Sequence, residues 1–66
     1  MNPGDHVIAV HGDQAYDAIV LAVIEIADDQ PPMLDLLVDV PGVRPLPVHG
    51  VMAPNLGGEW SWRART

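Results

Sequence analysis

The chain has 66 residues, no cysteine and a formal net charge of −6, from nine acidic residues against three basic ones. This length allows one domain at most, and the absence of cysteine excludes disulfides and thiolate zinc sites. The three basic residues are all arginines in the last third of the chain, which argues against nucleic acid or an anionic membrane surface as partners. Because so short a chain has a marginal core, we expect it to be stabilised by association with other chains.

Targeting signals are not evident in the sequence. No apolar run approaches the roughly 20 residues of a membrane-spanning helix, and residues 1–5 lack the basic start of a signal peptide. We therefore expect a soluble chain that is made in the cytoplasm.

The first half of the chain predicts two strands separated by turns. Residues 2–5 and 11–14 carry Gly and Asp, with Pro in the first of them, and so predict turns on either side of a strand at 6–10. A longer strand is predicted at 16–26. Eight of the nine residues at 18–26 are apolar and five are Ile or Val, which favours a strand covered on both faces by the rest of the chain.

A helix is the alternative structure for this long segment. Asp13 is a suitable cap for a helix over residues 14–27, whose apolar stripe would contain Ala15, Ile19, Ala22, Val23 and Ile26. Against the helix, β-branched residues lose side-chain freedom there and pack well on a pleated sheet. We therefore prefer the strand.

The segment 34–40 has the clearest pattern in the chain. Every second position from 34 to 40 is apolar, while Asp35 and Asp39 between them are acidic. This period of two predicts a strand with one buried face and one mostly wet face. Prolines and acidic residues at 28–32 predict a loop before it, and the pair at 41–42 predicts a tight turn after it.

A strand at the edge of the sheet is predicted next, at residues 43–48. Pro45 and Pro47 remove two N–H groups from the same side of this segment, so it can pair along one side only. Residues 49–51 predict a short turn or a single turn of helix, and residues 52–58, which carry proline and glycines, predict a linker.

The last segment, 59–63, alternates again and places Trp60 and Trp62 on one face. Short strands at spacings of about ten residues, with turn signals between them, indicate an all-β fold. The predicted fold is a small SH3-like barrel of four or five short antiparallel strands with a glycine-containing C-terminal arm. Residues 1–51 would form the barrel, and residues 52–66 an arm or its last strand.

Catalytic and metal-binding groups are not predicted. His6 and His11 point to opposite faces of a regular strand, and His49 lies in a distant predicted turn, so no zinc-ligand spacing results. Asp28 and Asp29 belong to a solvated loop rather than to a pocket that would raise a carboxyl pKa. With one serine, one threonine and no lysine, the sequence offers little for nucleophilic or phosphoryl chemistry. We predict no catalytic residue, no metal and no cofactor.

The two tryptophans are the most informative side chains. In one interpretation they fold back as a last strand and fill the barrel. In the other they anchor an interface, because Trp and Arg are favoured at the energetic centres of protein interfaces. The predicted partner-binding set comprises Val51, Met52, Leu56, Trp60, Trp62, Arg63 and Arg65.

The order of these segments resembles a group of small tailed-bacteriophage accessory virion proteins. The resemblance lies in the opening at residues 3–7, the strands at 16–23 and 34–42, the segment 48–51, and the closing Gly57-Gly58-Glu59-Trp60-Ser61-Trp62. In that group a short β-barrel is followed by a glycine-containing segment and a Trp-x-Trp ending. Arg63 stands where those proteins usually carry a proline.

This resemblance implies a non-enzymatic role as a capsid-associated accessory protein of the virion, of decoration or connector type. Its partners would be a larger capsid or connector protein, copies of itself, or both, with no nucleic acid and no membrane. One alternative is a phage-encoded adaptor or inhibitor that binds a host protein through its acidic surface. A second is an enzyme built as an oligomer of small barrels around a shared pore.

Overall fold

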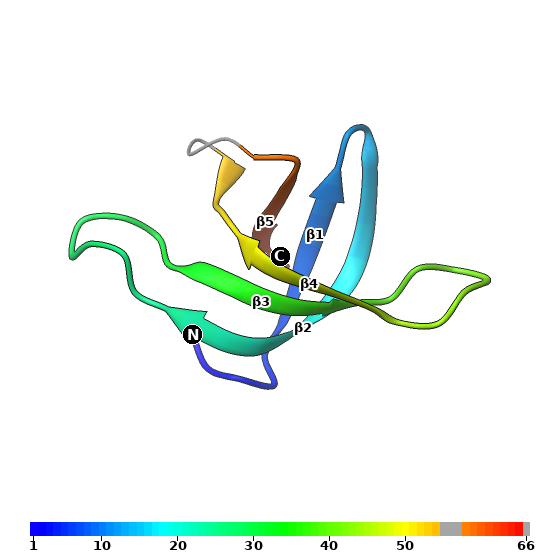
Figure 1. Ribbon diagram of the computed structural model, residues 1–66, viewed down its shortest axis with the longest axis horizontal. Coiled ribbons are helices and arrows are strands. Elements are labelled where there is room, and N and C mark those ends of the chain that lie inside the picture. The colour runs from blue at the N-terminus through cyan, green and yellow to red at the C-terminus, as the bar shows by residue number, and fades with distance from the viewer. Residues whose placement is uncertain (55–57, 66) are drawn as a thin grey trace.

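A computed structural model describes residues 1–54 and 58–65 of the chain. Within these residues the chain forms one antiparallel sheet of five strands (Figure 1). The strands are β1 (His6–His11), β2 (Gln14–Ile24), β3 (Met33–Val38), β4 (Leu46–Val51) and β5 (Trp60–Ala64). In the described part of the chain, no helix is long and apolar enough to cross a membrane.

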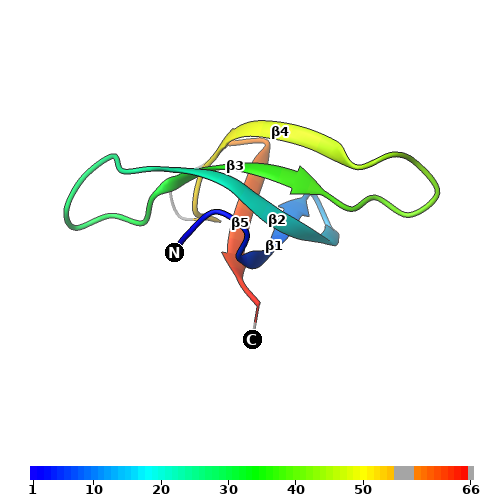
Figure 2. The same ribbon diagram turned by 90° about the horizontal axis from the view of Figure 1, so that it is seen from below.

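The sheet has the order β4-β3-β2-β1-β5 and curls until its two edge strands meet at one point (Figure 2). There the backbone N–H of Trp62 donates to the carbonyl oxygen of Met52 at 3.1 Å, and Met52 forms an isolated parallel bridge with Ser61. This order and closure confirm the predicted all-β fold, a small SH3-like barrel. The alternative helix over residues 14–27 is wrong, because β2 pairs along its length with β1 and β3.

The barrel begins with a tight hairpin between β1 and β2. Gly12 takes a φ of +61°, as the first central residue of a type II′ turn must, and the two strands pair from His11↔Gln14 to His6↔Ile19. Since the pairing fixes which side chains share a face, Val7 lies opposite Ala18 on the inner face of the sheet.

The core lies on the concave inner face. Its most buried large side chains are at alternate positions, as the pattern at 34–40 predicts for Leu34, Leu36 and Val38. The buried residues are Val7, Ala9, Ala18, Val20, Leu34, Leu36, Val38, Val51, Ala53 and Trp62. Among the described residues no polar or charged residue is buried, so this core is held by apolar packing.

The outer face of the long central strand is uncovered, which corrects the prediction for residues 18–26. Ala18 and Val20 are buried, but Ile19 is 38% exposed and Leu21 is 45% exposed. The sequence of this segment predicted that both faces would be covered, because polar residues do not alternate with the apolar ones. A sheet that curls upon itself encloses only its concave side, and no second layer of described residues lies over the convex side (Figure 2).

The second half of the chain agrees with the prediction at the sheet edge and differs in the turn. β4 is an edge strand, as predicted, but it begins at Leu46 rather than at residue 43, so of the two prolines only Pro47 lies in it, where it pairs with Leu37. The turn predicted at 49–51 is wrong, because these residues are the end of β4. A register shift between Leu34 and Leu36 accompanies this extension, and Val51 there pairs with Leu34 in the core.

Candidate functional site

The predicted partner-binding residues separate into buried and accessible positions. Val51 is 1% exposed and Trp62 is 9% exposed, so both contribute to the core of the chain. Trp60 and Met52 are half-buried. Arg63 and Arg65 are exposed. Leu56 lies outside the described residues.

Trp62 is attached to the barrel from two sides. Its backbone closes the sheet against Met52, and its indole Nε1–H donates to the carbonyl oxygen of Pro32 at 3.0 Å. A buried indole usually finds such a hydrogen-bond acceptor. Trp62 therefore fills the barrel as the last-strand interpretation predicted, and β5 is a part of the sheet.

Trp60 has a different environment beside the β1–β2 hairpin, where it is half-buried and packs against the core. Its ring lies 4.7 Å from that of His11 and 6.2 Å from that of Tyr16, between ring centroids. His11 Nε2 is also 3.0 Å from Glu59 Oε1. These four residues, the Trp60 cluster, come together because the β1–β5 pairing sets His11 opposite Trp60. The cluster offers a half-buried aromatic surface beside a carboxylate.

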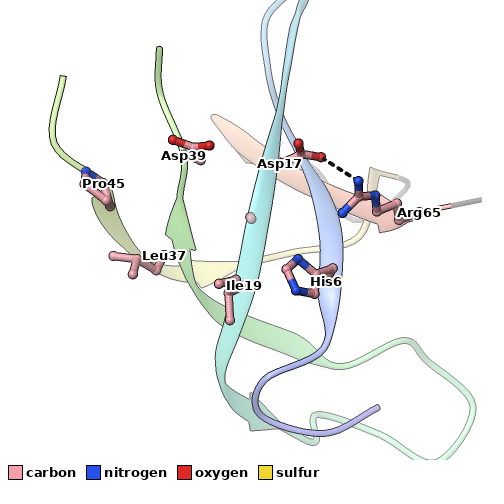
Figure 3. Close-up of a pocket in the computed structure, with 8 residues that line it drawn as sticks. His6, Asp17, Ile19, Leu37, Asp39, Pro45 and Arg65 are labelled. Carbon is pink, nitrogen blue, oxygen red and sulfur yellow. Dashed lines mark ion pairs between the residues drawn. The ribbon is translucent and has the colours of Figure 1, made fainter. Parts of the chain in front are cut away.

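A second candidate site is a pocket on the outer face of the sheet (Figure 3). The pocket has a volume of about 280 Å³. Strand pairing builds its floor, because Ile19 on β2 lies between His6 on β1 and Leu37 on β3. The outer-face pocket is lined by His6, Asp17, Ala18, Ile19, Leu37, Asp39, Pro45 and Arg65.

The outer-face pocket combines an apolar floor with a charged rim. Ile19 and Leu37 provide the floor, and Pro45 adds an apolar wall. On the rim, Arg65 Nη2 lies 3.8 Å from Asp17 Oδ1, while Asp39 forms no ion pair among the described residues. Such a surface suits a ligand that carries both an apolar group and a positive charge.

The pocket residues other than Arg65 were not predicted as site residues from the sequence. Asp39 was recognised only as part of the wet face of its strand, and Ile19 was expected to be covered. The pocket depends on residues from three strands and from the chain beyond β5. It therefore becomes visible only once the strand register is known.

Metal binding has no candidate position in the described part of the chain, where no group of three or more His, Cys, Asp or Glu residues could hold an ion. His6 lies in the outer-face pocket, whereas His11 belongs to the Trp60 cluster. His49 Nδ1 lies 3.6 Å from Asp35 Oδ2, between β3 and β4.

Comparisons of this chain with protein-family models, with curated proteins and with solved structures find no match. The description of the chain therefore comes from its structure, a small all-β barrel with an uncovered outer face. Its similarity to phage accessory proteins stays a prediction from the sequence.

Proposed function

We propose that this chain is a non-enzymatic structural protein of a bacteriophage virion, where it binds larger capsid or connector subunits as a decoration or connector-type accessory protein. The order of segments and the Trp-x-Trp ending suggest this class. The fold supports the proposal, since the resemblance implies a short β-barrel and the chain forms one.

The observation that carries the proposal is the uncovered apolar outer face of β2. Ile19 and Leu21 are each exposed by more than a third. Complete burial of such a side chain contributes about 1.5–3 kcal/mol, so covering the exposed part would contribute about 1 kcal/mol for each residue. A partner subunit that covers this face would gain that free energy.

Incorporation into particles tests the proposal. Mass spectrometry of purified particles of the phage whose genome encodes the chain should detect it at a stoichiometric copy number. Neighbouring genes for capsid and connector proteins are also expected. A freely soluble chain that is absent from purified particles would contradict the proposal, and capture of a single host protein instead would favour the adaptor alternative.

A pair of matched variants tests the role of the outer face itself. Leu21→Glu places a charge on the uncovered face of β2, while Ile26→Glu makes the same change at a residue of similar exposure, 39% against 45%, in the loop after β2. We expect Leu21→Glu to reduce incorporation and Ile26→Glu to leave it unchanged. Equal incorporation of both variants would show that this face is not the docking surface.

A further inference from the structure

The turn between β3 and β4 displays an apolar and a basic residue side by side. Val43 is 64% exposed, more than any other large hydrophobic residue among those described, and Arg44 follows it as an exposed residue. This turn projects from one end of the barrel (Figures 1 and 2). Its apolar and charged groups are the two kinds that the outer-face pocket is able to bind.

The turn is held in one conformation by its own backbone. The N–H of Val43 donates to the carbonyl oxygen of Val40 at 3.3 Å. Pro41 and Gly42, with φ +83°, occupy the central positions, as in a type II turn. A turn that is already ordered loses little conformational freedom when it binds, which favours its use as a docking element.

The charges of the turn and the pocket are complementary. Arg44 forms no ion pair with another described residue, and neither does Asp39 on the pocket rim. Among the described residues, Asp17 forms one ion pair, the long 3.8 Å contact with Arg65. Neither Val43 nor Arg44 lines the pocket of its own chain, so within one molecule these two residues do not occupy it.

We propose that two copies of this chain form a reciprocal dimer, in which the Val43-Arg44 turn of each copy docks in the outer-face pocket of the other. Val43 contacts the floor formed by Ile19 and Leu37, and Arg44 pairs with Asp39. The dimer is tested on the purified chain, so its test is separate from that of incorporation into particles, although both partners would cover Ile19.

The position of the turn beside the pocket is compatible with two-fold symmetry. Asp39 and Pro45 line the pocket and are also the two ends of the turn. An axis that passes beside them therefore inserts both turns at once, as self-complementary interfaces require. A standard interface covers about 800 Å² of each partner, here about a fifth of the 4290 Å² surface of the chain, and the reciprocal arrangement makes each contact twice.

Sedimentation equilibrium over a concentration series reaching about 1 mM tests the dimer. The mass should rise from 7.1 kDa toward about 14 kDa, which is twice that value. Arg44→Asp and Asp39→Arg each place like charges together in the contact, so each should raise the dissociation constant by about tenfold or more. Val43→Asp, which puts a charge against the apolar floor, should have the same effect.

Mixing the two charge variants gives the decisive result. In a mixed dimer, the aspartate introduced by Arg44→Asp in one copy faces the arginine introduced by Asp39→Arg in the other. The original pair of Arg44 with Asp39 forms at the second contact, so an equimolar mixture should regain the dimer. A charge pair within one chain would not be restored by mixing. Asp28→Arg, the same charge change as Asp39→Arg at an exposed loop residue outside the pocket, is the matched control and should dimerise normally.

Three outcomes would overturn the proposal: a wild-type chain that stays at 7.1 kDa throughout the series, a mixture that stays monomeric, or an Asp28→Arg variant that dissociates as readily as Asp39→Arg. If the wild-type chain stays monomeric, the pocket would instead be expected to bind a basic segment of another protein. Circular dichroism in the aromatic region confirms that every variant is folded, because Trp62 lies in the core.

Discussion

Replacing one leucine on each face of the sheet measures how unequal the two faces are. Leu36 is 0% exposed in the core, and Leu21 is 45% exposed on the outer face. Truncation of a buried leucine to alanine costs about 2–5 kcal/mol, whereas surface substitutions stay within about 0.5 kcal/mol. For 66 residues, about 0.05–0.15 kcal/mol per residue gives a total stability of about 3–10 kcal/mol. Leu36→Ala should therefore remove a large part of the stability, and Leu21→Ala almost none.

Urea denaturation followed by tryptophan fluorescence provides the measurement. The two variants carry the same chemical change, so differences in side-chain volume and strand propensity cancel between them. The experiment is performed at low micromolar concentration, where self-association contributes least. A Leu21→Ala variant as unstable as Leu36→Ala would refute the reasoning, because it would mean that the outer face is covered within a single chain.

Two further predictions concern Gly42 in the turn after β3 and the indole of Trp62 in β5. Gly42→Ala should lower the free energy of unfolding by about 1–2 kcal/mol, because a φ of +83° strains an L-residue even though the added Cβ meets no atom within 4 Å. Urea titration measures this loss. Gly42→Asn should cost less, since Asn tolerates a positive φ. Trp62→Phe removes the donor to Pro32 and leaves a smaller ring in the core, so it should cost about 1–3 kcal/mol. Since about 1 kcal/mol lowers the melting temperature of a domain this small by about 4–8 °C, an unchanged thermal transition in Trp62→Phe would contradict the role of that hydrogen bond.

Local patterns predicted those parts of the fold that depend on one strand at a time. The alternation around Asp35 identified the inner face of β3, and Pro45 and Pro47 identified the strand at the sheet edge. Both signals act through the backbone of the strand that carries them. They needed no knowledge of the neighbouring strands.

Features that depend on several strands escaped prediction. An unbroken apolar run such as 18–26 has the same composition whether one or two layers cover it, so the exposure of Ile19 and Leu21 was missed. Residues 49–51 predict a turn, yet they pair as a strand, and Gly50 N donates to Asp35 Oδ1 at 3.0 Å across the two strands. The outer-face pocket, assembled by strand register, was likewise invisible in the sequence.

The closure of the barrel has a consequence for its internal motions. One backbone hydrogen bond, from Trp62 to Met52, joins the two edges of the described sheet, whereas several successive residue pairs join each of the other neighbouring strands. Breaking this one hydrogen bond costs less free energy than separating any pair of neighbouring strands. The sheet can therefore open locally between its two edges while its four antiparallel strand pairings persist. The interior beside Trp62 is then the part of the core that solvent reaches first.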